Sequence, residues 1–122
     1  MEEKKVYYTT TKDFELFTSE SKIWIERLGL KEWEWTFLHE KLKNTRAEYV
    51  SCNESKMVDV TLNTEFSFPF DEEEIRRVAF HEVCEVFLNE FRIMTENYYT
   101  KTIVNKEIHT VIRRLENLIF KV

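Results

Sequence analysis

Residues 81–85, which read His-Glu-Val-Cys-Glu, carry side chains whose types and spacing suit the binding of a metal ion. On a helix, His81 and Glu85 lie one turn apart on the same face, so that both can reach one ion. Zinc hydrolases carry the motif H-E-x-x-H on such a helix, and its glutamate serves as the general base. Glu82 stands at the position of that base, and Glu85 replaces the second histidine. The segment is therefore a one-letter variant of a zinc-hydrolase motif.

A catalytic zinc site holds three protein ligands and leaves a position open for water. His109 is the candidate for the third ligand, because it borders the apolar stripe of a predicted helix that can pack against the motif helix. With His81 and Glu85 it would make a His₂Glu set, the ligand composition of one class of catalytic zinc site. Glu107 is an alternative third ligand, although it points away from His109 on the same helix. We expect one zinc ion, with Glu82 as the general base.

Each of these side chains also has a structural interpretation. Glu85 would then form a salt bridge, with Arg77 or Lys106 as its partner. His109 would be a hydrogen-bonded histidine at a packing boundary. Cys84 is a further candidate ligand, but a cysteine at an apolar helix position is more often a buried filler of the core.

The motif lies in a predicted helix that runs from residue 72 to about residue 93. Asp71 is expected to cap this helix, with Glu74 as its capping-box partner three residues later. Apolar residues occupy most of the circumference of the helix, which is typical of a central, buried helix.

The elements on either side of the motif helix must position it. Residues 12–28 have apolar residues at helical spacing, and Gly29 supplies a helix stop. A last helix is predicted from about residue 103 to residue 120. His39 is expected at the surface. Three segments between the first helix and the motif helix read as strands joined by short turns, most simply as a meander: residues 33–37, 46–52 and 58–62.

The order of helix, small sheet, helix and helix predicts an α+β fold with a three-stranded, antiparallel-type sheet. At 122 residues the chain is expected to be a single domain, residues 1–122. Residues 63–70 form a predicted loop, and its aromatic side chains would cover a pocket or an interface: Phe66, Phe68 and Phe70.

Composition narrows the class of protein. Hydrophobic residues make up 43% of the chain, which is typical of a packed globular protein. The net charge is −5 and basic residues are interleaved with acidic ones, so we expect no nucleic acid partner. No apolar run approaches the ~20 residues of a membrane span, and we expect a cytoplasmic protein. Cys52 and Cys84 are expected to be free thiols.

Residues 75–88 resemble the motif helix of small phage and prophage proteins described as metallopeptidases, which are related to the SprT-like zincins. Upstream, residues 24–34 resemble the N-terminal helix and first strand of that family. Downstream, residues 107–117 resemble its final helix, in which a histidine serves as the third ligand. The resemblance therefore covers most of the chain in the order of that family.

This resemblance implies a minimal zincin-like domain: an N-terminal helix, a three-stranded sheet, a central motif helix and a C-terminal helix. By position it implies that His81 is the first ligand, Glu82 the general base and His109 the third ligand. Glu85 departs from the second histidine of the family, which affects catalysis more than metal binding. The zinc ribbon of many SprT proteins is absent from the sequence.

Three hypotheses follow. The first is a zinc-dependent metallopeptidase or related hydrolase of phage type, acting on a peptide or protein substrate in the cytoplasm, or in the host cytoplasm if it is phage-encoded. The alternative is a catalytically inactive zincin-like protein that binds a host protein as an inhibitor or regulatory factor. The third is a structural metal site that joins the last helix to the motif helix.

Overall fold

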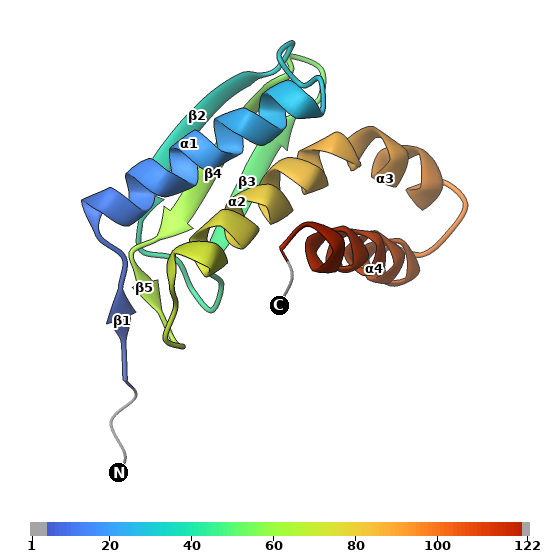
Figure 1. Ribbon diagram of the computed structural model, residues 1–122. Helices are drawn as coiled ribbons and strands as arrows, with labels where there is room; N and C mark the ends of the chain where they lie inside the picture. The colour runs from blue at the N-terminus through green and yellow to red at the C-terminus, as the bar shows by residue number, and fades with distance from the viewer. Residues whose placement is uncertain (1–4, 121–122) are drawn as a thin grey trace.

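The computed structural model describes residues 5–120, which form an α+β fold (Figure 1). Helices α1 and α2 pack side by side against the larger sheet, α3 continues beyond α2, and α4 turns back alongside α2. This is the order of elements expected for a minimal zincin-like domain. The elements are β1 (Tyr7–Tyr8), α1 (Thr11–Arg27), β2 (Glu34–Glu40), β3 (Ala47–Cys52), β4 (Met57–Asn63), β5 (Glu65–Phe66), α2 (Glu72–Phe87), α3 (Asn89–Glu96) and α4 (Lys101–Ile119).

Helix α1 supports the sheet and begins at a complete capping box. The hydroxyl of Thr10 accepts a hydrogen bond from the backbone N–H of Asp13, and the Asp13 carboxylate accepts one from the backbone N–H of Thr10. Gly29 follows the helix with φ of 70°, a left-handed conformation that glycine adopts without steric cost, as predicted. The side chains of Phe17 and Ile25 face the core.

The three predicted strands form one sheet, but their order is β2-β4-β3. Strand β4 pairs antiparallel with β3 and parallel with β2. The prediction of an antiparallel meander is therefore wrong, because β2 pairs with β4 and does so in parallel. The sheet is mixed, with β4 at its centre.

Burial explains why β4 takes the centre. Its side chains Val58, Val60 and Leu62 are almost completely buried, whereas β2 and β3 are partly exposed along most of their length. The 41–46 loop then has to cross the end of β4, and Asn63 at that end binds it. The Asn63 side chain accepts a hydrogen bond from the backbone N–H of Leu42 and donates to the carbonyl of Thr45.

A second, small sheet joins the predicted aromatic loop to the N-terminal strand β1. Strand β5 pairs antiparallel with β1, and each contributes two residues, which is too short for a periodic signal in the sequence. Phe66 on β5 is buried in the core, whereas Phe68 after it is exposed.

Helix α2 carries the motif and is buried, as predicted. Asp71 caps it by accepting a hydrogen bond from the backbone N–H of Glu74 at 2.9 Å. The Glu74 side chain pairs with Arg46 across the fold. The helix ends at Phe87, so the predicted extension to residue 93 is wrong. The chain bends at Leu88 and continues as α3.

Hydrogen bonding to the sheet holds this bend. Asn89, the first residue of α3, is buried, and its amide donates to Oδ1 of Asn53 in the β3–β4 turn at 2.6 Å. A polar side chain that is buried and fixed to the sheet there favours a separate helix over a continuation of α2.

Helix α4 closes the fold against α2. Val104, Ile108 and Ile112 on α4 pack with Phe80 and Cys84 of α2 in a second hydrophobic cluster. This packing brings α4 beside the motif. Within residues 5–120, no helix is long and apolar enough to cross a membrane.

Candidate metal centre

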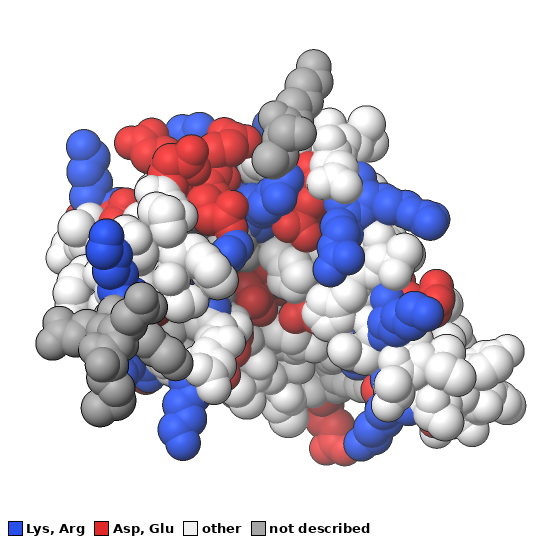
Figure 2. Space-filling model, turned by 90° about the horizontal axis from the view of Figure 1, so that it is seen from below, with Lys and Arg blue, Asp and Glu red and all other residues white. Residues whose placement is uncertain are grey.

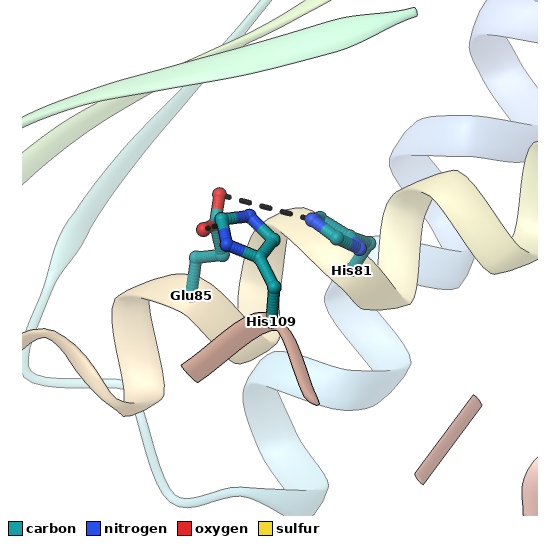
Figure 3. Close-up of side chains that lie close together, drawn as sticks. All are labelled: His81, Glu85 and His109. Carbon is teal, nitrogen blue, oxygen red and sulfur yellow. Dashed lines mark ion pairs between the residues drawn. The ribbon is translucent and has the colours of Figure 1, made fainter. Parts of the chain in front are cut away.

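The structure brings His81, Glu85 and His109 together (Figure 3). One potential ligand atom from each residue lies within 4.8 Å of the others. Nε2 of His109 is 3.1 Å from Oε1 of Glu85, and Nε2 of His81 is 3.9 Å from Oε2 of Glu85. The three predicted ligands therefore converge around one carboxylate.

Two helices produce this convergence. His81 and Glu85 are one turn apart on α2, as the spacing predicts. His109 follows Ile108, whose buried side chain anchors α4 against α2, and the two imidazole rings lie 5.5 Å apart. Glu107, the alternative third ligand, is exposed and lies outside the cluster.

Hydrogen bonds at Nδ1 fix which nitrogen each histidine presents. Nδ1 of His109 is 2.8 Å from the carbonyl oxygen of Asn105, which can only accept, so Nδ1 carries the proton. Nδ1 of His81 is 3.2 Å from Oε2 of Glu116, and a carboxylate likewise accepts. In both rings Nε2 is left to face Glu85. Metal-binding histidines typically show this arrangement, with the second nitrogen bound to a carboxylate or a carbonyl.

The contact between His109 and Glu85 needs a positive charge. In a neutral His109 with its proton on Nδ1, the lone pair of Nε2 would point at a carboxylate oxygen only 3.1 Å away, which is repulsive. Either a second proton on the ring or a cation between the two groups makes the contact favourable. Neighbouring ligands of a tetrahedral zinc ion lie roughly 3.3–3.5 Å apart, from bond lengths of about 2.0–2.2 Å. The two measured contacts, 3.1 and 3.9 Å, lie on either side of this spacing, so that the three side chains could hold a divalent metal ion after small movements.

Glu116, which the sequence reasoning missed, is the residue that orients His81. It lies on α4 and is 9% exposed, and its other oxygen is 3.8 Å from Nε of Arg77. The sequence indicates this role only weakly: Glu116 is seven residues after His109, which places the two on the same face of a helix.

A cation already neighbours Glu85. Nη2 of Arg92, on α3, donates to Oε1 of Glu85 at 3.3 Å, and Nη1 of the same guanidinium donates to Asn105 at 3.1 Å. The partner of Glu85 is thus Arg92, and neither Arg77 nor Lys106, the two predicted by the structural interpretation, pairs with it.

Glu82 is buried beside this cluster. It is 6% exposed, and its Oε2 atom has no hydrogen-bond partner within the described part of the chain. Burial, followed by the neighbouring charge of Glu85, raises the pKa of the Glu82 carboxyl to about 8, although His81 opposes the shift. A buried carboxyl with a strongly raised pKa next to the cluster is a candidate acid or base.

The surroundings of His81 act on it in opposite directions. Burial lowers the pKa of His81, but the hydrogen bond to Glu116 and the nearby carboxylates of Glu82 and Glu85 raise it more, and the net pKa lies above the ordinary value. Negative charge around this ring also favours a bound cation.

A groove of about 700 Å³ reaches one side of the site: His81, Glu82 and Glu116 line its inner end, whereas Glu85 and His109 are not among its lining residues. Its other walls come from the 41–46 loop and from Phe68 after β5. Figure 2 shows that this face is hollowed at its centre, with acidic atoms deep in the hollow and Lys and Arg side chains beside it. Glu82 and His81 are therefore reachable from solvent along one path.

The remaining candidates lie elsewhere. Cys84 is buried in the contact between α2 and α4, and burial raises the pKa of its thiol to about 11. His39 was expected at the surface. It is instead half-buried, hydrogen-bonded to Thr9 at 2.7 Å and stacked on Phe14 with ring centres 5.0 Å apart.

No protein-family model matches this chain, and no curated protein matches it. Among solved structures, the chain is similar to the crystal structure of the metallopeptidase zymogen of Methanocaldococcus jannaschii jannalysin. That similarity has a TM-score of 0.45 and 20% sequence identity, and it covers 81% of this chain and 96% of the other.

Proposed function

We propose that this protein is a metallopeptidase that holds one zinc ion through His81, Glu85 and His109. The observation that carries the proposal is the fixed orientation of the two imidazoles. Each is bound at Nδ1 to an acceptor, so that each Nε2 faces the carboxylate of Glu85. Zinc suits two imidazoles and one carboxylate, with a fourth position left open.

Glu82 is the general base in this proposal. When bound, zinc would supply Lewis acidity that polarises the substrate carbonyl. A zinc ion nearby would oppose the upward shift in the pKa of Glu82 and favour its carboxylate form. That carboxylate would take the proton of the attacking water and return it to the departing amine. Its place at the inner end of the groove allows it to reach a peptide bond.

The resemblance of the motif helix and of the final helix to phage metallopeptidases related to SprT supports a peptide or protein substrate. The replacement of the second histidine by Glu85 leaves the number of ligands unchanged, because a carboxylate can itself bind the ion. A carboxylate in place of an imidazole lowers the net charge of the loaded site. We therefore expect turnover below that of a site with a complete H-E-x-x-H motif.

The test uses casein cleavage by protein that is purified without a metal-affinity tag and then loaded with zinc. Glu82→Gln should keep the metal and lower turnover by about 10²–10⁴-fold, the usual contribution of a general base. Glu72→Gln is the matched control, since it makes the same change at an exposed position of the same helix. Equal turnover of the Glu82 variant and the control would refute the proposed role of Glu82.

One observation favours a second candidate, a catalytically inactive zincin-like protein that binds another protein. Arg92 and a protonated His109 can neutralise Glu85 without any metal. Under this alternative the purified protein would bind no zinc and cleave no casein, and the cluster would only join α2, α3 and α4. The metal content of the purified protein separates the two candidates.

A further inference from the structure

The loop between β2 and β3 concentrates positive charge on one wall of the groove. Lys41, Lys43 and Arg46 all fall within six consecutive positions, and no acidic residue separates them. All three are exposed, and all three line the groove. This is a local excess of positive charge in a protein whose net charge is −5.

The fold holds this loop in place. The buried side chain of Asn63 accepts a hydrogen bond from the backbone N–H of Leu42. It also donates to the backbone carbonyls of Leu42 and Thr45, and the three distances are 2.7–3.2 Å. Asn44 adopts a left-handed conformation with φ of 53°, which asparagine tolerates better than most residues. The positive charges are thus carried by an ordered segment.

Two of these cations are available to a ligand. Arg46 is already engaged, because it pairs with Glu74 and lies over the ring of Phe68 at 5.9 Å. Lys41 pairs with Glu65 at 3.4 Å while its side chain is 76% exposed, and such surface pairs are weak. Lys43 is exposed at the same edge of the groove.

Acidic residues also line the groove, but none of them is exposed: Glu65 and Glu74 are half-buried, and Glu82 and Glu116 are buried. The exposed charged side chains of the groove are therefore cations, and its acidic groups are less accessible. The exposed ring of Phe68 adds an apolar surface next to Arg46, whose guanidinium lies over it. A ligand that matches this pattern carries negative charge at one end only.

We propose that the outer wall of the groove binds acidic side chains of a peptide substrate, through Lys41 and Lys43, while the bond to be cleaved lies at His81 and Glu82. This inference rests on the proposed function and names its substrate class: an extended segment with acidic residues on one side of the cleaved bond. A nucleic acid fits the groove less well, because its regularly spaced phosphates would also meet the carboxylates of Glu82 and Glu116.

Fluorescence anisotropy tests binding without requiring turnover. The probes are a labelled peptide in which glutamate alternates with alanine, the same peptide with lysine for glutamate, and a single-stranded DNA oligonucleotide. The protein variants are Glu82→Gln, used as the parent to prevent cleavage, and the same protein with Lys41→Glu and Lys43→Glu. Lys22→Glu is the control, because it reverses an exposed charge on α1 outside this groove.

The parent should bind the acidic peptide more tightly than the basic one, and salt should weaken this binding. Reversal of the two loop charges should weaken it by about tenfold at low salt, because two surface ion pairs are lost. The Lys22 control should bind as the parent does. Any one of three results would overturn the inference: both peptides bind equally, the loop reversal has no effect on binding, or DNA binds more tightly than the acidic peptide. If the protein binds the acidic peptide but takes up no zinc, the groove is a peptide-binding surface and the proposed zinc peptidase activity is refuted.

Discussion

Glu116 on α4 accepts a hydrogen bond from Nδ1 of His81 on α2 at 3.2 Å and thereby turns Nε2 of His81 toward Glu85. The last helix thus contributes twice to the candidate metal centre. It carries His109, and it also carries the carboxylate that orients the other histidine. The packing of α4 against α2 is what makes both contributions possible.

Removal of the Glu116 carboxylate should weaken zinc binding. In Glu116→Ala, Nδ1 of His81 loses its acceptor, and loss of such an outer partner typically lowers metal affinity by 10–100-fold. Competition with a chromophoric chelator measures the affinity. Glu107→Ala serves as the control, because Glu107 is an exposed acid on the same helix outside the cluster. Equal affinities of the two variants would rule out an orienting role for Glu116.

Loss of Arg92 should make the fold more dependent on zinc. In Arg92→Met the buried Glu85 carboxylate loses a cation, and such an unpaired group typically costs about 1–3 kcal/mol in the metal-free protein. Zinc would then supply the missing positive charge. Thermal melts should therefore show a lower Tm without metal and a larger increase on adding zinc than in the unchanged protein. An identical increase in both proteins would mean that Arg92 and zinc do not act on the same carboxylate.

The contact between α2 and α4 should dominate the stability of the site. Ile112 is completely buried there, and truncation of such a side chain to alanine typically costs about 2–5 kcal/mol. Urea unfolding of Ile112→Ala measures this loss. Leu118→Ala on the same helix should change stability by less than about 0.5 kcal/mol, because Leu118 is 74% exposed. Similar losses in both variants would contradict the observed packing.

The two cysteines should differ sharply in reactivity. Hydrogen bonds from Ser55 lower the pKa of the exposed Cys52 thiol, whereas burial raises the pKa of the Cys84 thiol to about 11. The thiolate is the reactive form, so iodoacetamide near neutral pH should modify Cys52 first. Mass spectrometry should find one modified thiol in the native protein and two after denaturation in urea. Modification of Cys84 in the folded protein would show that the α2–α4 contact opens readily.

The sequence predicted that His81, Glu85 and His109 would lie together, because each of them belongs to a helical pattern. The spacing of His81 and Glu85 is local, and the apolar stripe of the last helix fixes the face that bears His109. Glu116 and Arg92 were not predicted as parts of the site, because their roles depend on how three helices meet. No local signal distinguishes them from the other charged residues of those helices.

The errors in the fold have the same origin. The alternation of residues in β4 predicted a strand correctly, but its position between β2 and β3 depends on burial on both sides and on the binding of the 41–46 loop by Asn63. The apolar pattern of α2 continues past Leu88, so the bend there could not be found by periodicity. It depends on a hydrogen bond between Asn89 and Asn53, residues from two distant segments.

Zinc titration of the tag-free protein by calorimetry tests the central claim most directly. We expect saturable binding of one zinc ion per chain and its loss in His109→Ala, while circular dichroism shows that the variant remains folded. His39→Ala is the matched control, because His39 lies outside the cluster and should leave zinc binding unchanged. Two results would contradict the assignment of His81, Glu85 and His109 as a metal centre. One is that the unchanged protein shows no saturable zinc binding. The other is that the His109 variant binds zinc as tightly as the control.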